Sequence, residues 1–355
     1  MKFVNELSEG QRVESVYAVA DKQIRKTKQG KTFLSLRLTD KTGTVEAVVW
    51  DNADEYSAAF EKGDFIGVRA DVGSYNGSNQ LTVSRLKKVD PMPEYMARIM
   101  PTTDRDVEAM ATELAGFAAE IQTPAIRELM EGLFGDEAFM EAFKTAPAAK
   151  GMHHCFSGGL IQHSLKVARL CRIIYDEYAE NDPEIAELIS RDILIAGAIM
   201  HDMGKVEELT QGPVFDYTLK GRLLGHISLG LMSLRERLDK VDGMPEDAAE
   251  LLMHMILSHH GEYEYGSPKR PKCFEAFILH YADNLDAKIQ GLAEFAGKDT
   301  VEGKFTAFNR LYERQFYKGT PPGQTTDGQP QPSDTSGPDC EAGSGSLPGS
   351  LPESN

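Results

Sequence analysis

Residues 193–205 read ILIAGAIMHDMGK, an apolar run that ends in a His-Asp pair. The apolar part has the length of a buried helix segment and is too short for a membrane span. A buried helix that ends in His201 and Asp202 would carry an imidazole and a carboxylate into an internal cavity. Borderline divalent metals prefer these two ligand types. The stretch therefore predicts a helical domain built around an internal metal site.

The histidines of the chain are concentrated in one region. All nine lie between residues 153 and 280, and folding alone does not require such crowding. Several partnerless imidazoles in one core would be costly, so an ordered set of them predicts metal ligands. We expect His254 to be a hydrogen-bonded core residue instead. His280 lies three residues before Asp283, so a core role and a ligand-supporting role both stay open. The polar landmarks in chain order are His163, His201, Asp202, His226, His259, His260 and Asp283.

Longer motifs surround these landmarks and resemble a known family. The order of the motifs resembles the HD-domain phosphohydrolases, and within them the YhaM-type 3′→5′ exoribonucleases, in which an OB-fold precedes an HD domain. The resemblance rests on long motifs over residues 147–288 and on architecture over residues 1–90. Gly266-Ser267-Pro268 stands where the HD-GYP cyclic-dinucleotide phosphodiesterases carry Gly-Tyr-Pro, which favours the exoribonuclease group. The motifs are PAAKGMHHCFSGGLIQHS at 147–164, HDMGK at 201–205, GRLLGHISLG at 221–230, SHHGEYEYGSPKRP at 258–271 and EAFILHYADNLDAK at 275–288.

The resemblance implies a pair of metal sites. It assigns the first site to His163, His201, Asp202 and Asp283. Asp202, with two oxygens, would bridge to a second metal that is completed by His226 and by His259, His260 or both. We expect two divalent cations per chain, with Mn²⁺ as the first choice, although the ligands also suit Fe²⁺, Co²⁺ or Zn²⁺. Two such cations can activate water and stabilise charge during phosphodiester cleavage, so no protein nucleophile is needed.

Basic residues near this set are expected to contact a nucleic-acid backbone. Lys205 follows the metal pair by one turn and would reach a phosphate oxygen as a point charge, which makes it the second expected catalytic residue beside Asp202. The further substrate contacts expected around the cavity mouth are Lys150, His153, His154, Lys269 and Arg270.

Residues 11–88 predict a small barrel. Strands are expected at 12–20, extending toward residue 26, and at 32–39, 44–50, 65–73 and 80–88, with a short helix at 53–61. Three strands, a helix and two strands are the order of an OB-fold, which often binds single strands. Tyr75, Lys28 and Lys31 lie in predicted loops and are the preferred binding candidates. Half or more of the aromatic candidates are expected to fill the barrel interior instead; the candidates are Tyr17, Phe33, Trp50, Phe65 and Tyr75.

Prolines at 91, 93 and 101 mark a boundary after the barrel, since proline removes ladder donors and breaks helices. The fold class predicted is therefore multidomain: an all-β OB-fold over 1–90, a linker over 91–103 and an all-α HD domain over 104–320. The segment 321–355 is rich in Pro, Gly, Ser and Thr and is expected to be a disordered tail. Helical apolar faces are predicted at 189, 193, 196, 199 and 200, at 252, 255, 256 and 259, and at 274, 277, 278, 281 and 285.

The net charge of −17 does not exclude an RNA partner. Residues 1–90 carry 14 Lys/Arg against 13 Asp/Glu, so the acidic excess lies downstream, where some carboxylates would bind metal. The balance predicts no strong nonspecific, salt-sensitive binding. The first residues lack the apolar run of a signal peptide, and the four cysteines lack CxxC spacing. We expect a cytoplasmic protein without a membrane partner.

The preferred interpretation is a metal-dependent 3′→5′ exoribonuclease that hydrolyses single-stranded RNA to nucleoside monophosphates. Direction and preference for RNA rest on the resemblance, so single-stranded DNA stays open as a partner, as does a homo-oligomer. One alternative is an HD-type phosphodiesterase or phosphohydrolase that acts on a small nucleotide. The other is a single-stranded nucleic-acid-binding regulator with structural metals. Closed structural sites rarely need a bridging carboxylate and a phosphate-placed lysine, which disfavours the regulator.

Overall fold

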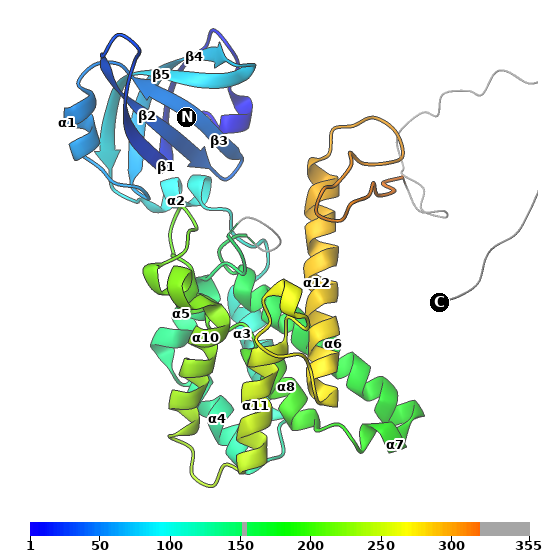
Figure 1. Cartoon of the computed structure of the whole chain (residues 1–355). Helices are drawn as coiled ribbons and strands as arrows, with labels where there is room; N and C mark the ends of the chain where they lie inside the picture. Colours follow the sequence, from blue (N-terminus) through cyan, green and yellow to red (C-terminus); the bar gives the residue numbers. More distant parts are fainter. Residues whose placement is uncertain (151–154, 320–355) are drawn as a thin grey trace, which may run out of the picture. The chain divides into compact units, whose positions relative to one another are not determined.

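The computed structural model describes residues 1–150 and 155–319, in which a β-barrel is followed by helices (Figure 1). The tail expected at 321–355 lies outside the described residues. No helix in the described ranges combines the length and the apolar character needed to cross a bilayer.

The barrel confirms the predicted OB-fold. Its strands close in the order β1-β2-β3-β5-β4, with β3 and β5 parallel and the other pairs antiparallel. A register shift between Val19 and Asp21 lets the long first strand pair with β4 on one side and β2 on the other. Alternate residues of β2, Leu34, Leu36 and Leu38, are fully buried in the barrel core. The elements are η1 (Val4–Glu6), β1 (Arg12–Lys26), β2 (Thr32–Asp40), β3 (Gly43–Val49), α1 (Ala53–Ala58), β4 (Phe65–Tyr75) and β5 (Ser78–Val89).

The domain after the barrel is mainly helical up to Lys298, as predicted, whereas the all-α prediction does not hold for residues 299–319, which form turns and isolated bridges. The apolar run at 193–200 lies in α8, where every residue from Asp192 to Met200 is buried. This helix packs between α6 and α11, and Gly197 lets α11 approach because a Cβ there would meet the Met255 side chain at 2.5 Å. The elements are α2 (Pro93–Ile99), α3 (Val107–Ala119), α4 (Pro124–Phe134), α5 (Glu137–Thr145), α6 (Gly159–Asn181), α7 (Pro183–Ala186), α8 (Arg191–Met200), α9 (Lys205–Glu208), α10 (Leu219–Leu238), α11 (Glu246–Ser258), η2 (Tyr263–Tyr265) and α12 (Phe274–Lys298).

The apolar face predicted along α12 lies at the surface of the chain. Phe274, Phe277, Tyr281 and Leu285 are 48–62% exposed. The buried face of α12 is instead made by a mixed set that includes the polar residues of the site. The periodicity of the sequence identified the apolar face of the helix correctly. It does not show whether other parts of the chain bury that face. The buried residues are Glu275, Ala276, Leu279, His280, Ala282 and Asp286.

A second compact unit begins at Ala296. Within its described part, isolated bridges join Phe305 to Tyr317 and Asn309 to Arg314. Lys318 donates to the Asp299 carboxylate at 2.5 Å. The described part of this unit is therefore held by local pairings.

Candidate metal centre

Helix ends bring the predicted ligands together. His163 lies in the second turn of α6, and His201 and Asp202 directly follow α8. His226 follows Gly225, whose φ of 71° kinks α10. The pair at 259–260 directly follows α11, and Asp283 lies in the middle of α12. The five elements converge, so each helix contributes one or two ligand candidates.

The first group of donor atoms brings together the four side chains that the resemblance assigned to one site. His163 Nε2 lies 3.1 Å from Asp283 Oδ1 and 3.4 Å from Asp202 Oδ2. His201 Nε2 lies 3.2 Å from His163 Nε2 and 3.3 Å from Asp202 Oδ2. Ligands about 2.1 Å from one cation stand about 3.0–3.4 Å apart at octahedral or tetrahedral angles. These four side chains therefore fit one shared cation.

A second group faces the other oxygen of Asp202. Asp202 Oδ1 lies 3.5 Å from His226 Nε2 and 3.6 Å from His259 Nε2. All three atoms are buried without a hydrogen-bond partner among the described residues. His260 joins this group, since the ligand atoms of His226, His259 and His260 lie within 4.8 Å of one another. Orphaned buried polar atoms are rare and costly, and a cation would satisfy all of them together.

Every histidine of the two groups is held through its Nδ1. A carbonyl or carboxylate oxygen only accepts, so Nδ1 donates, and Nε2 is left as the atom that would bind a metal. Two of the acceptors are carboxylates, and three are backbone carbonyls. The carbonyl pairs are His201 with Ala198 at 2.8 Å, His259 with Ile256 at 2.8 Å and His260 with Tyr265 at 2.9 Å.

The two supporting carboxylates, Asp286 and Glu208, were not predicted from the sequence. Asp286 Oδ2 lies 2.8 Å from His163 Nδ1. Glu208 Oε1 accepts from the backbone N–H of His226 at 2.9 Å and lies 3.2 Å from its Nδ1. Both sit three residues after a predicted site residue, a spacing that places two side chains on the same helix face. That spacing is the signal that could have found them.

Two glycines permit the close packing behind the second group. A Cβ at Gly204 would come within 2.0 Å of the His226 carbonyl oxygen and 2.4 Å of the Gly230 nitrogen. A Cβ at Gly221 would come within 2.1 Å of the Glu208 carbonyl oxygen. Backbone fills the space in each case, so neither position accepts a side chain without moving a ligand or its support.

Burial and charge set the protonation of the centre. Burial opposes ionisation of Asp202, but Lys205 and His201 hold its pKa well below the ordinary value. Burial would lower the pKa of His163, but hydrogen bonds to the carboxylates around it raise that pKa well above the ordinary value. Burial, together with the neighbouring His259, lowers the pKa of His260 to about 4. His260 is therefore neutral, the form that binds metal, across the physiological range.

Lys205 lies at the centre, where the sequence placed it. Its Nζ is 2.7 Å from Asp202 Oδ2, and its side chain is 13% exposed. Burial would lower its pKa, but Asp202 raises it, so the ammonium keeps its charge. The predicted substrate contacts His153 and His154 lie outside the described residues.

Two of the three other predicted basic contacts are paired with carboxylates. Lys150 Nζ donates to Asp216 Oδ1 at 2.5 Å. Arg270 forms an ion pair with Glu262 at 2.8 Å. Lys269 is exposed to solvent. None of these three side chains lines the cavity at the metal centre.

The remaining two histidines of the described region support the fold. His254 Nε2 accepts from the backbone N–H of Lys272 at 3.0 Å, in keeping with the structural role expected for it. His280 is 7% exposed, and its Nδ1 lies 2.8 Å from the His259 carbonyl oxygen. His280 therefore holds the backbone of a ligand candidate, which is the supporting role that the sequence left open.

A cavity of about 210 Å³ opens onto the centre. Ligand candidates from both groups form part of its lining. Lys205 and His280 line it beside the ligand candidates. Three residues with no predicted role complete the lining: Tyr265, Asn284 and Ala287.

One groove of the barrel combines aromatic and basic side chains. Its volume is about 530 Å³, and its lining includes Phe33, Trp50, Tyr75, Arg25 and Arg37. The Phe33 and Trp50 ring centroids are 4.9 Å apart, and Trp50 and Tyr75 are 38% and 63% exposed. The groove lies over β1, β2, β3 and the β4–β5 turn, the face through which OB-folds bind oligonucleotides.

The outcomes for the other barrel predictions differ. Tyr17 is 0% exposed and lies in the barrel core. Phe65, 5% exposed, packs in a separate cluster with Ala18 and Ile99, so fewer of the aromatic candidates fill the interior than the expected half. Lys28 is exposed, and Lys31 forms an ion pair with Asp51 at 3.3 Å. Neither lysine lines the aromatic groove.

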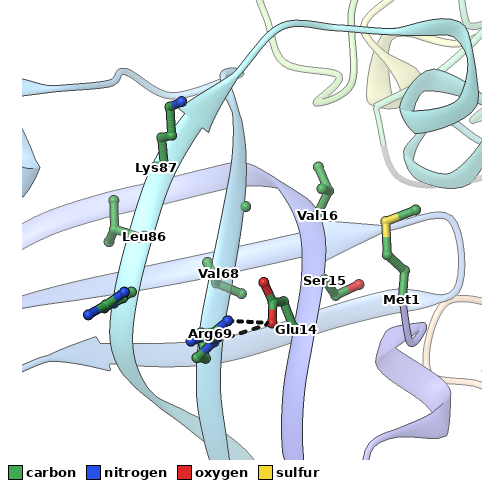
Figure 2. Close-up of a pocket in the computed structure, with 10 residues that line it drawn as sticks. Met1, Glu14, Ser15, Val16, Val68, Arg69, Leu86 and Lys87 are labelled. Carbon is green, nitrogen blue, oxygen red and sulfur yellow. Dashed lines mark hydrogen bonds and ion pairs between the residues drawn. The ribbon is translucent and has the colours of Figure 1, made fainter.

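A second barrel groove, of about 440 Å³, lies over β1, β4 and β5 and has no aromatic lining (Figure 2). Arg69 in it is bound to Glu14 at 2.8 Å, whereas Lys87 points away from that pair. Base stacking needs a ring, so the groove that contains Trp50 and Tyr75 is the better nucleic-acid candidate.

Comparison with known proteins covers both regions. The family described as HD domain matches residues 160–288, and the family described as OB-fold nucleic acid binding domain matches residues 18–89. A 3′-5′ exoribonuclease YhaM from Geobacillus sp. (strain WCH70) is 35% identical over 294 residues, which are 81% of this chain and 86% of the relative. The protein of the same name from Bacillus subtilis (strain 168) is 35% identical over 294 residues, 82% of this chain and 90% of the relative.

A third relative extends the match further. The 3′-5′ exoribonuclease YhaM of Bacillus velezensis is 34% identical over 317 residues, 88% of this chain and 96% of the relative. Such identity over most of both chains identifies the family predicted from the motifs. The chain belongs to the YhaM family of 3′-5′ exoribonucleases.

Proposed function

We propose that this chain hydrolyses single-stranded RNA from the 3′ end, releases nucleoside 5′-monophosphates and uses two divalent cations. One observation carries the two-cation part: each oxygen of Asp202 faces a different group of histidine Nε2 atoms. The choice of RNA and the 3′→5′ direction are supported by family membership, because the curated relatives carry the name 3′-5′ exoribonuclease.

The two donor groups suggest the ligand sets. We infer that His163, His201, Asp202 and Asp283 would hold one cation, and that Asp202, His226, His259 and His260 would hold the other. When bound, the cations would polarise the scissile phosphate and lower the pKa of an attacking water. The chain's own residues fix the ligand rings through Nδ1 and keep His260 neutral.

Lys205 would bind the substrate phosphate. In the structure its ammonium lies 2.7 Å from Asp202 Oδ2. Once that oxygen coordinates a cation, the ammonium can turn to a non-bridging phosphate oxygen within the same cavity. Lys205 would then stabilise the charge that develops on the phosphate in the transition state.

Mn²⁺ is our first choice for both sites. Up to five imidazoles with two aspartates form a nitrogen-rich set of intermediate softness, which suits Mn²⁺, Fe²⁺, Co²⁺ and Zn²⁺ better than Mg²⁺. Metal analysis of the purified chain and activity after reconstitution with each ion separate these choices. Activity with Mg²⁺ alone at the Mn²⁺ rate would contradict this ligand argument.

The decisive experiment follows the products of end-labelled single-stranded RNA with Mn²⁺, with and without chelator. A 3′ label should appear at once as mononucleotide, a 5′ label should pass through a ladder of shortening chains, and chelation should stop both. Asp202→Asn should abolish nucleotide release, because it removes a bridging charge. The variant should keep its fold and its RNA binding, which a melting curve and a binding titration would check. An Asp202→Asn protein that degrades RNA at the wild-type rate would refute the mechanism.

The same assay tests the alternatives. Hydrolysis of a cyclic dinucleotide in preference to every member of an RNA length ladder would indicate a small-nucleotide phosphodiesterase. Metal-independent RNA binding with no nucleotide release would indicate a regulator with structural metals. DNA and RNA oligonucleotides of one sequence, run in parallel, settle the preference between them.

We propose that the aromatic groove of the barrel holds the incoming strand, with Trp50 and Tyr75 stacking on bases. Stacking contributes about 1–3 kcal/mol per base, so Trp50→Ala should weaken binding of a long RNA about tenfold. Cleavage of a dinucleotide should be affected much less, because it offers few bases for stacking. Lys28 and Lys31 would add backbone contacts at its edge, and a charge-reversed pair should reduce the salt dependence of binding.

The exposed face of α12 supports self-association with a second copy of the chain. Phe274, Phe277, Tyr281, Leu285 and Ile289 follow one helix face and are 48–62% exposed. Half-exposed side chains of this size offer about 100 Å² each, or about 500 Å² per copy, which approaches the area of a specific interface. Light scattering should show a larger mass for the wild type than for Leu285→Asp. Ile173→Asp, at an exposed position on α6, is the control that should leave the mass unchanged.

We also propose that the protein acts in the cytoplasm. Cys171 and Cys273 are free thiols in the described ranges. Unpaired cysteines are typical of reducing compartments. Fractionation of cells with an antibody to the chain checks this.

A further inference from the structure

One wall of the cavity at the metal centre is made by residues that the proposed metal sites do not use. Tyr265 and Asn284 line it, and Ala287 follows one turn of α12 after Asp283. An aromatic ring offers a surface for a base, an amide offers hydrogen bonds to hydroxyl groups, and a methyl side chain leaves room between them. This composition is suited to a nucleoside.

Tyr265 has a fixed backbone and an uncovered ring. Its carbonyl accepts the Nδ1–H of His260 at 2.9 Å, which ties the backbone directly to a ligand candidate. Gly266, with a φ of +81°, ends the short helix η2 immediately after it. The tyrosine side chain is nevertheless 60% exposed. A large apolar ring held in place beside a metal centre, with most of its surface free, is available for stacking.

The neighbouring Tyr263 provides a natural contrast. It belongs to the same turn and is 59% exposed, but it does not line the cavity. The Arg270 guanidinium lies over its ring, 5.0 Å from the centroid. Exposure is matched between the two tyrosines, so position at the cavity is what distinguishes Tyr265.

Asn284 carries an unused amide into the same cavity. It directly follows the ligand candidate Asp283, is partly buried and makes no side-chain hydrogen bond to any other residue in the described ranges. The amide has both a donor and an acceptor, so it can bond two adjacent hydroxyl groups at the same time. Adjacent hydroxyls are what the ribose at an RNA 3′ end presents.

We propose that Tyr265 and Asn284 form the subsite for the 3′-terminal nucleotide, with the Tyr265 ring stacked on its base and the Asn284 amide bonded to its ribose hydroxyls. The proposal rests on the proposed exoribonuclease function and adds the residues that recognise the strand end. The scissile phosphate then lies beside Asp202 and Lys205. Water oxygen bonds to phosphorus, the bond from phosphorus to O3′ of the penultimate nucleotide breaks, and that O3′ takes up a proton. The terminal nucleotide leaves as a 5′-monophosphate.

The size of the cavity agrees with a chain end. Its volume of about 210 Å³ is below the range of about 300–1,000 Å³ of pockets that enclose a whole small ligand. One sugar and its phosphate fit such a space while the base projects toward the exposed Tyr265 ring. A site of this kind selects by the terminal sugar and tolerates any base.

The sugar contact is tested with two RNAs of one sequence that differ only in a 3′-terminal ribose or 2′-deoxyribose. Wild-type kcat/KM should favour the ribose end, and Asn284→Ala should reduce that preference about five- to tenfold, the effect of one or two hydrogen bonds. Asn284→Ser, which keeps a hydroxyl, should fall between the two. The readout is the ratio of the two kcat/KM values measured with one protein preparation. A misfolded fraction lowers both values equally, so it does not change the ratio.

The base contact is tested with a third RNA that has an abasic 3′-terminal residue. Tyr265→Ala should lower kcat/KM about tenfold on normal RNA and leave the abasic substrate unchanged. Tyr265→Phe should retain the wild-type preference because it keeps the ring. Tyr263→Ala is the matched control and should resemble the wild type on every substrate.

The outcomes separate this proposal from the function on which it rests. If wild-type protein releases mononucleotides but Asn284→Ala and Tyr265→Ala lose the same factor on both members of each substrate pair, the subsite is refuted and the exoribonuclease function stands. If wild-type protein releases no mononucleotide from any RNA, both are refuted. A loss on only one member of a substrate pair supports the role proposed for the residue that was changed.

Discussion

Replacement of Asp286 by asparagine tests how the centre orients its ligands. Asp286 Oδ2 lies 2.8 Å from His163 Nδ1, and the side chains of both residues are almost completely buried. Asparagine keeps the shape and an accepting oxygen but removes the negative charge. Supporting carboxylates of this kind typically contribute 10- to 100-fold to metal affinity. Because an acceptor remains, we expect a loss near the lower end, about tenfold, or about 1.4 kcal/mol.

The assay is calorimetric titration of metal-depleted protein with Mn²⁺, followed by RNA hydrolysis at limiting and saturating Mn²⁺. Asp286→Asn should show weaker binding at one site and a rate that saturating metal largely restores. Asp192→Asn is the matched control: Asp192 is also buried and accepts from the backbone N–H groups of Gln122 and Thr123 at 3.0 and 2.7 Å. It precedes His201 by nine residues on α8, about 13 Å along the helix.

The control should lose thermal stability and retain metal affinity. Two results would refute the reasoning. An Asp286→Asn protein that binds Mn²⁺ as tightly as the wild type would show that the carboxylate does not tune the His163 imidazole. An equal loss of affinity in Asp192→Asn would show that any buried carboxylate in this domain has the same effect.

Three further predictions concern packing, metal and pH. Gly204→Ala should lower both the melting temperature, by several degrees or more, and the Mn²⁺ affinity, because its Cβ would lie 2.0 Å from the His226 carbonyl oxygen; an unchanged thermogram would contradict this packing. Adding Mn²⁺ to 100 times its Kd should stabilise the metal-depleted chain by about 2.7 kcal/mol, read as a rise in melting temperature that Asp202→Asn largely abolishes. The raised pKa of His163 means that metal must displace a proton, so Mn²⁺ affinity should rise by up to about tenfold per pH unit from pH 6 upward, with proton release in a weakly buffered titration. In the metal-free chain the same raised pKa adds stability that is fully present below pH 6.5 and is lost as the pH rises through the raised value; a flat stability profile would count against it.

Residue type made the ligand candidates visible in the sequence. Imidazoles such as His201 and His259 have few structural reasons to occur in a buried apolar helix end, so their order alone indicated a metal centre. The barrel was equally accessible, because alternating β-branched residues and glycine turns define strands locally. Both predictions depend on short-range patterns that folding preserves.

Other features depend on contacts that short-range patterns do not encode. The spacing of Asp286 and Glu208 places each on the same helix face as a site residue, but only the folded chain shows which histidine each one supports. Lys150 and Arg270 carry the right charge, but each meets a carboxylate of its own. The periodicity of α12 identifies an apolar face without revealing that its opposite face, with Asp286, is the buried one.

The helix ends that supply the ligands also have a consequence for interpreting variants. The Nδ1–H of His201 bonds the carbonyl of Ala198 in the last turn of α8, and that of His259 bonds Ile256 in the last turn of α11. The last four carbonyls of a helix lack intrahelical partners, so each of these rings also acts as a C-terminal cap. Alanine at either position removes a cap as well as a ligand. Glutamine or asparagine, whose amide can still donate to the carbonyl, would separate loss of metal from fraying of the helix.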